Sequence, residues 1–294
     1  MKIVRFKGGL GNQMFQYAFL KNLEVLYGLT NIYADVSDYD KLKDDAVRKL
    51  RIEGLNIQIH KANTEDIKSI CFFIRGDDPL KIKTKLKIAI EGMFNKRYFF
   101  EKSQKFLNID QLIKYSYFDG YWQSWKYVNN VSNDLRNEFQ LKKTNKSFLK
   151  KENEIKKEDG VFVGIRCGDY LESKKATRKF GGFQKEYYLN AMEYLAKRIH
   201  NPKFYIFSND LDFVKKNLPI AKYKYEYCNQ NRRYNDLEEM FLMGSCKHAV
   251  ISNSTFNWWG AWLINNKNKI VIAPKKWFYN NKSSDIVPPE WIRL

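Results

Sequence analysis

The second half of the chain alternates between short apolar runs of strand length and longer helical patterns, an order that few folds accommodate. The expected strands are 161–166, 203–208, 224–228, 248–252 and 269–274, with expected helices at 185–200, 211–218, 236–246 and 255–265. Strands that alternate with helices at short spacing form a parallel sheet covered on both faces. The pattern predicts a doubly wound α/β domain, in which ligands bind beyond the carboxyl ends of the strands. The segments after Ile165, Phe207 and Ile251 are therefore the expected place for a site.

The amino-terminal residues predict a second parallel unit. A strand at 2–6 is followed by a glycine turn, by a helix at 12–28 and by another strand at 31–36. This order is one βαβ unit. Between residues 36 and 145 the pattern is less regular, and the order of its elements does not follow from the sequence.

A polar, lysine-rich stretch at 141–160 separates the two patterns. It has no clear apolar stripe, so it predicts a boundary between residues 1–150 and residues 151–294. A charged surface helix is the alternative interpretation. A length of 294 residues also favours two domains over one.

The formal net charge of +19 predicts anionic partners, which include phosphorylated ligands, nucleic acid and acidic membrane surfaces. A generic solvated surface is the alternative, because many of the lysines lie beside Asn and Glu. No apolar run approaches the roughly 20 residues that span a bilayer, and the first 20 residues lack the unbroken apolar segment of a secretion signal. These features predict a cytoplasmic protein. Four dispersed cysteines and three histidines without ligand spacing indicate neither a disulfide framework nor a zinc site.

Residues 8–13, "GGLGNQ", lie at the turn between the first strand and the first helix. Glycines there can bring backbone N–H groups close to a phosphate at the helix start. The amides of Asn12 and Gln13, together with the backbone at Gly11, can then bind a sugar or a diphosphate. The spacing matches neither GxGxxG nor a P-loop, and a tight turn alone also explains the glycines.

Two helix starts in the second half carry further candidates. Asn253, Ser254 and Thr255 stand directly before or at the start of an expected helix, where hydroxyl and N–H groups can hold a pyrophosphate. An N-cap role explains the same residues. The first turn of the preceding helix carries Asp236, Glu238 and Glu239, which either complement the helix dipole or supply a carboxylate that accepts hydrogen bonds from a guanine edge or a ribose.

The stretch "GIRCGDY" places Arg166 at the carboxyl end of the first strand of this half. A guanidinium there suits bidentate binding of phosphate and stabilises charge on a leaving diphosphate. Asp169 is expected to orient Arg166 or to meet a hydroxyl, and a structural ion pair is the alternative. Asp210 and Asp212 form a D-x-D at a strand-to-helix junction, where helix capping is the preferred interpretation over a metal site.

Six motifs in order resemble the bacterial α-1,2-fucosyltransferases of glycosyltransferase family 11. They are "GGLGNQMFQYAF", "DGYWQSWKYV", "GIRCGDY", "EEMFLMGSCKHAVISNSTFNWWGAWL", "KIVIAPKKWF" and "PPEWIRL". The resemblance implies a GT-B architecture, with two Rossmann-like lobes and the active site in the cleft between them. The first lobe, 1–150, is then the acceptor side and the second, 151–294, binds the donor.

The implied reaction is metal-independent, inverting transfer of L-fucose from GDP-β-L-fucose to the 2-hydroxyl of a galactoside, with no further cofactor. Transfer of another nucleotide-activated sugar is the alternative. The implied catalytic residues are Arg166, Asp169 and Asn12, of which Arg166 binds the donor diphosphate. The implied donor contacts are Gly11, Asn12, Gln13, Arg166, Glu239, Asn253, Ser254 and Thr255.

The chain departs from the family pattern H-x-R-R-x-D, because Gly164 replaces the His and Cys167 replaces the second Arg. Either Arg166 suffices for the donor, with Lys or Arg from elsewhere in the chain filling in, or the donor is not GDP-fucose. Asp169 and Glu172 are candidate bases. Nucleic-acid binding is a remote alternative, because no nucleic-acid motif accompanies the basic charge. The lysines instead predict a peripheral contact with an anionic membrane at its inner face, consistent with surface polysaccharide synthesis.

Overall fold

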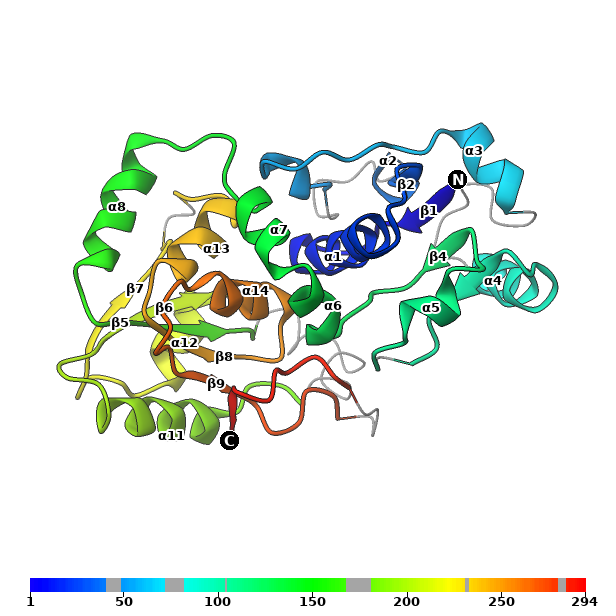
Figure 1. Ribbon diagram of the computed structural model, residues 1–294. Coiled ribbons are helices and arrows are strands. Elements are labelled where there is room, and N and C mark those ends of the chain that lie inside the picture. Colours follow the sequence, from blue (N-terminus) through cyan, green and yellow to red (C-terminus); the bar gives the residue numbers. More distant parts are fainter. Residues whose placement is uncertain (41–48, 72–81, 104, 168–180, 231–232, 280–283) are drawn as a thin grey trace. The chain divides into compact units, whose positions relative to one another are not determined.

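The computed structural model describes residues 1–40, 49–71, 82–103, 105–167, 181–230, 233–279 and 284–294 (Figure 1). The chain divides into two compact units. Unit 1 comprises Met1–Gln140 and Ser284–Ile286, and unit 2 comprises Leu141–Ser283 and Val287–Leu294. Among the described residues, no helix combines the length and the apolar character that crossing a membrane requires.

Unit 1 is built on a parallel sheet of four strands in the order β2-β1-β4-β3. Its strands are β1 Lys2–Arg5, β2 Ile32–Asp35, β3 Tyr98–Phe100 and β4 Tyr117–Asp119. Its helices are α1 Leu10–Tyr27, α2 Ser37–Asp40, α3 Thr64–Ile70, α4 Ile82–Phe94, α5 Ile109–Leu112, α6 Trp125–Asn130 and α7 Ser132–Glu138, with a 3₁₀ turn at Ile52–Gly54. The predicted βαβ unit is confirmed as β1, α1 and β2.

Unit 2 contains a parallel sheet of six strands in the order β10-β9-β8-β5-β6-β7. Its strands are β5 Gly160–Ile165, β6 Lys203–Ser208, β7 Lys224–Tyr227, β8 His248–Ile251, β9 Val271–Ala273 and β10 Ile292–Arg293. Its helices are α8 Lys146–Lys156, α11 Lys185–Ala196, α12 Leu211–Asn217, α13 Asp236–Gly244 and α14 Thr255–Leu263. The predicted doubly wound parallel sheet is confirmed.

The strand order fixes where a ligand is expected in unit 2. The chain runs from β5 outward to β7, then returns to the other side of β5 and runs outward again through β8, β9 and β10 (Figure 1). The direction reverses between β5 and β8, which makes their carboxyl ends the topological switch point where doubly wound sheets bind ligands. In unit 1 the corresponding pair is β1 and β4.

The division into units falls at Gln140 and not at residue 150. The expected boundary at 141–160 contains α8, so the charged surface helix is the interpretation that the structure supports. Phe148 and Ile155 are the buried residues of this helix, and α8 packs against α13 within unit 2. The apolar stripe consists of few residues, which is why the composition resembled that of a linker.

Aromatic side chains of the "DGYWQSWKYV" motif form part of the core of unit 1. The Trp122 ring is fully buried and stacks on Phe19, with ring centroids 3.8 Å apart, and Tyr127 packs edge-on against the same Phe19 ring. These two rings are therefore packing elements and not exposed platforms for a sugar.

Candidate functional site

The carboxyl ends of β5 and β8 lie side by side in unit 2. Gly164 pairs with Ile251, and the Ser252 N–H donates to the Gly164 carbonyl at 3.0 Å. Arg166 and Asn253 each stand two residues beyond that pair. Arg166 is partly exposed, so this residue is not fully buried in the core. The predicted anion-binding groups of both strands thus converge on one edge of the sheet.

The start of α14 is shaped by buried polar side chains. Asn257 donates from Nδ2 to the Ser252 hydroxyl at 2.8 Å, and Asn253 donates to the Trp277 carbonyl at 3.2 Å. Ser254 occupies the N-cap position, but its side chain makes no capping hydrogen bond. Capping therefore does not account for this serine. The first-turn N–H groups and the positive end of the helix dipole remain suited to an anion.

Two packing constraints explain the departures from the family motif. A Cβ on Gly164 would lie 2.4 Å from Nδ2 of Asn257, so this β5 position has no room for the histidine. Cys167 is buried, its N–H donates to Oδ1 of Asn209 at 3.0 Å, and its Sγ lies 3.4 Å from the Ser208 hydroxyl. An arginine at position 167 would have to occupy that buried space. Asp169 and Glu172 lie outside the described residues.

The Gly164 contact predicts a large effect from a single methyl group. Gly164→Ala is expected to displace Asn257, break its hydrogen bond to Ser252 and lower the free energy of unfolding by about 1–3 kcal/mol. The measurement is denaturant unfolding. Gly164→Ala/Asn257→Ser should recover part of the loss because it restores space.

Gly9→Ala is the control, since a Cβ there has no neighbour within 4 Å. Equal stability of the Gly164→Ala and Gly9→Ala proteins would contradict the packing argument.

The start of α13 separates two neighbouring glutamates into different roles. Glu238 is buried in a capping box with Asn235 and also accepts from Nδ2 of Asn145 at 2.6 Å. Glu239 instead accepts from Nδ2 of Asn229 at 2.5 Å. Burial raises the pKa of Glu239, although the Asn229 hydrogen bond opposes that shift. Glu238 accounts for the cap, and among the described residues Oε1 of Glu239 accepts no hydrogen bond, so it is available to another partner.

Asn229 also shapes the loop that follows β7. Its φ of 58° is left-handed, a conformation that asparagine adopts more readily than most residues. Its side chain accepts from the Tyr234 N–H at 2.9 Å and donates to the Tyr234 carbonyl at 3.1 Å. One side chain therefore links this loop to Glu239.

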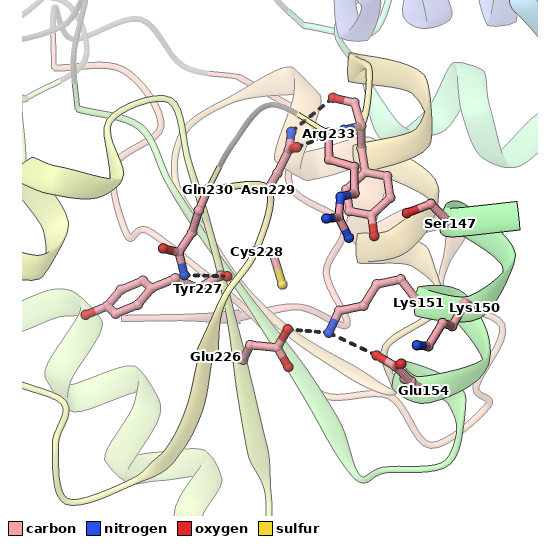
Figure 2. Close-up of a pocket in the computed structure, with 11 residues that line it drawn as sticks. Ser147, Lys150, Lys151, Glu154, Glu226, Tyr227, Cys228, Asn229, Gln230 and Arg233 are labelled. Atoms are coloured by element: carbon pink, nitrogen blue, oxygen red, sulfur yellow. Dashed lines mark hydrogen bonds and ion pairs between the residues drawn. The ribbon is translucent and has the colours of Figure 1, made fainter. Parts of the chain in front are cut away.

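A polar cavity of about 430 Å³ opens beside this loop (Figure 2). It is lined by Ser147, Lys150, Lys151, Glu154, Glu226, Tyr227, Cys228, Asn229, Gln230, Arg233 and Tyr234. Figure 2 shows Lys151 between Glu226 and Glu154, with which it forms ion pairs. Lys150 and Arg233 have no ion-pair partner within the described part of the chain. The cavity lies at β7, two strands from β5, so it is not the place where the diphosphate is expected.

In unit 1, Asn12 lies at the carboxyl edge of β1 and β4. Its Oδ1 accepts from Nε2 of Gln123 at 2.8 Å, and its N–H donates to the Gly9 carbonyl at 2.9 Å. Gly8 has φ of 85°, and a Cβ there would lie 2.5 Å from Nδ2 of Asn12. The glycine turn and the "DGYWQ" segment together hold the Asn12 amide, which is partly exposed.

Gln13 does not fit its predicted role as a donor contact. It is fully buried, and its Nε2 donates to the carbonyls of Gly8 and Lys49, while its Oε1 accepts from the N–H groups of Arg51 and Ile52. These four bonds use the whole hydrogen-bonding capacity of the amide. Gln13 is therefore a structural residue that fixes the segment before the 3₁₀ turn. Gly11 is likewise buried, in the first turn of α1.

A charged cluster lies at the same edge of unit 1. Asp119, fully buried at the end of β4, accepts from Arg5 at 2.9 Å, from Tyr98 at 2.8 Å and from Lys7. Burial alone would raise the pKa of Asp119, but Lys7 and Arg5 outweigh it and hold this pKa at about 2. Asp119 is therefore an ionised anchor for Lys7 and not a proton acceptor near neutral pH.

Glu101, directly after β3, has the opposite electrostatic character. One of its oxygens, Oε2, accepts from the N–H groups of Tyr121 at 2.6 Å and Trp122 at 3.1 Å. Burial raises the pKa of Glu101 to about 7, against the effect of these hydrogen bonds and of Lys7. A carboxylate with a pKa near the operating pH suits general base catalysis. Glu101 is not among the residues predicted from the sequence, because "FFEKS" carries no motif and β3 was not predicted.

The D-x-D at the start of α12 is a cap, as predicted. Asp210 accepts from the Phe213 N–H at 2.9 Å, and Asp212 pairs with Lys215 at 3.5 Å. Over the described residues, no group of three or more His, Cys, Asp or Glu side chains is arranged to hold a metal ion.

Comparison with known proteins agrees with the motifs. The model of glycosyl transferase family 11 matches residues 1–294. An Escherichia coli alpha-1,2-colitosyltransferase is 30% identical over 99% of this chain and 98% of its own length. An Aotus azarae galactoside alpha-(1,2)-fucosyltransferase 1 is 25% identical over 60% of this chain and 51% of its own length. The crystal structure of fucosyltransferase NodZ from Bradyrhizobium aligns with a TM-score of 0.48 at 12% identity, over 88% of this chain and 91% of that one. The chain belongs to glycosyltransferase family 11.

Proposed function

We propose that this chain is an inverting glycosyltransferase that moves a 6-deoxy-L-hexose, either L-fucose or colitose, from a GDP-activated donor to the 2-hydroxyl of a galactoside. The observation that carries the proposal is the convergence of Arg166 and the Ser252–Thr255 segment on the β5 and β8 edge of unit 2. A guanidinium and a helix N-terminus at a topological switch point suit a diphosphate.

In the proposed reaction, the acceptor oxygen attacks the anomeric carbon while GDP leaves from the opposite face. The negative charge that grows on the diphosphate is stabilised by Arg166 and by the start of α14. These groups supply positive charge from the protein itself, so we propose that neither a metal nor another cofactor is required. Unit 2 is then the donor side and unit 1 the acceptor side.

The remaining site residues take complementary roles in the proposal. Glu239 accepts hydrogen bonds from the guanine edge, and the Asn229 hydrogen bond holds it in place. Asn253, Ser254 and Thr255 contact the phosphates. In unit 1, Glu101 removes the proton of the acceptor hydroxyl, and the Asn12 amide orients a hydroxyl group. Asp169 keeps its proposed role of orienting Arg166.

The choice between the two donors follows from one hydroxyl group. Colitose is L-fucose without its 3-hydroxyl. A site that hydrogen-bonds a hydroxyl rejects the analogue lacking it by about 10⁴–10⁵, whereas an apolar site rejects an added hydroxyl by only about 10². The size of the ratio between the kcat/KM values for GDP-fucose and GDP-colitose therefore shows whether the site hydrogen-bonds the 3-hydroxyl, and so which of the two is the native donor.

The test is a panel of four donors, GDP-fucose, GDP-colitose, GDP-mannose and UDP-galactose, each with a galactoside acceptor. The quantity measured is the nucleoside diphosphate released. We expect turnover with one or both of the first two and an α-1,2 product by NMR. Turnover with UDP-galactose alone would contradict the proposal and favour another nucleotide-activated sugar.

Thermal stabilisation by GDP, but not by duplex DNA or RNA at physiological salt, would separate the transferase from the nucleic-acid-binding alternative. We further propose that the chain acts at the inner face of an anionic membrane as a peripheral protein, because its net charge is +19.

A further inference from the structure

Helix α4 of unit 1 turns a polar face inward. Glu91 is fully buried and Asn95, just beyond the helix, is 4% exposed. Nδ2 of Asn95 donates to Oε1 of Glu91 at 2.5 Å and to the Ile70 carbonyl at 2.6 Å. These hydrogen bonds attach the end of the helix to α3 through polar groups. The side of α4 that faces the unit is therefore not purely apolar.

The outward face of α4 is apolar. Leu86, Met93 and Phe94 have 63%, 74% and 70% of their surface exposed. They stand at i, i+7 and i+8, which places them on one side of a helix. Met93 is two positions from the buried Glu91, about 200° around the axis, so it points away from the anchored face. A soluble surface helix normally shows the reverse arrangement.

Cations accompany this face in the sequence. Residues 82–97 contain Lys83, Lys85, Lys87, Lys96 and Arg97, and their single acidic residue is Glu91. Lys96 and Arg97 are exposed directly after the helix. Because Glu91 is buried, no carboxylate of this segment lies on the outward face. The surface therefore combines exposed apolar side chains with the exposed cations Lys96 and Arg97, neither of which has an ion-pair partner within the described part of the chain.

We propose that the outward face of α4 docks on an anionic lipid bilayer, with Leu86, Met93 and Phe94 in the interface and Lys96 and Arg97 at the headgroups. An apolar face flanked by lysine and arginine is the form of helix that binds such an interface. A second copy of the chain fits less well, because it would oppose two basic segments and two net charges of +19. The proposal gives the membrane contact described above a defined surface.

The test is flotation of the full chain with two kinds of vesicle. One contains phosphatidylcholine alone, and the other also contains roughly 30 mol% phosphatidylglycerol, an anionic lipid content at which basic segments next to a membrane bind. We expect binding to the anionic vesicles only. Met93→Ser/Phe94→Ser should weaken it at least about tenfold, through loss of buried apolar area. Lys96→Gln should weaken it by about fivefold, and added salt should weaken it further.

The matched controls are Val25→Ser/Leu26→Ser, which removes two exposed apolar residues at the end of α1, and Lys143→Gln, which removes an exposed lysine of unit 2. Both should bind like the wild type. Three outcomes would overturn the proposal: no binding of the wild type, equal loss in the controls, or a dimer in light scattering that Met93→Ser/Phe94→Ser abolishes. Vesicle binding needs neither donor nor acceptor, so its failure would leave the transferase proposal standing.

Discussion

Replacing Arg166 with alanine is expected to lower kcat/KM for the GDP-sugar donor by about 10²–10³. The guanidinium stands at the switch point of the unit 2 sheet, where charge on the departing diphosphate is greatest in the proposed reaction. An interaction that strengthens as the diphosphate leaves contributes to kcat more than to substrate binding. The loss should therefore appear mainly in kcat, with a smaller rise in the Kd for GDP.

Lysine at this position separates charge from geometry. Arg166→Lys keeps the positive charge but loses the planar fork, so it should recover only part of the activity. Arg198→Ala is the matched control, because Arg198 lies on the same unit and packs over the Tyr194 ring instead of at the strand edge. Unchanged turnover in Arg166→Ala, with a normal unfolding transition, would remove Arg166 from the mechanism.

The sequence predicted five of the six strands of unit 2, β5 to β9, because each lies between helical patterns, whereas the two-residue β10 was not predicted. All six residues of β5 are buried, so this strand shows a continuous apolar signal. The neighbours in a parallel sheet also follow from chain order through a few handedness and switch-point rules. The expected carboxyl edges after Ile165 and Ile251 are therefore adjacent in the structure.

The later strands of unit 1 could not be predicted in the same way, because they are too short to show a hydrophobic period. β3 and β4 have three residues each; β4 pairs with β3 and, across a long stretch of chain, with β1. Nothing local in the sequence encodes those pairings. Glu101 was missed for the same reason, since its position at a strand end is visible only once β3 is known.

The roles of individual side chains within a motif could not be predicted from the sequence either. Asn12 and Gln13 are adjacent amides, yet one is partly exposed and the other is consumed by four backbone hydrogen bonds. In the sequence, Gly164 was only a departure from the histidine of the family pattern. The structure shows that a glycine at this position leaves space for the Asn257 side chain. Such distinctions depend on contacts between segments that are distant in the chain.

Glu101→Gln is expected to lower kcat by about 10²–10⁴, the usual contribution of a general base. Glutamine keeps an oxygen that can accept from the Tyr121 and Trp122 N–H groups, so the turn before Gln123 should survive. In the wild type, kcat/KM should rise with pH through about 7 as Glu101 loses its proton, and this limb should be absent from the residual activity of the variant.

Stability provides a second readout that does not depend on catalysis. The pKa of Glu101 is about 7 in the folded chain, above the ordinary value of 4.5 that applies to the unfolded chain. Between these two pH values the folded chain therefore binds a proton that the unfolded chain has lost. Stabilisation from this group is therefore present below pH 4.5 and is lost as pH rises through about 7. Glu101→Gln should remove that loss, whereas Glu65→Gln, an exposed carboxylate of α3, should not. If Glu101→Gln loses activity but its kcat/KM still rises with pH through about 7, another group is the base. If Glu101→Gln keeps full activity, Glu101 has a structural role alone.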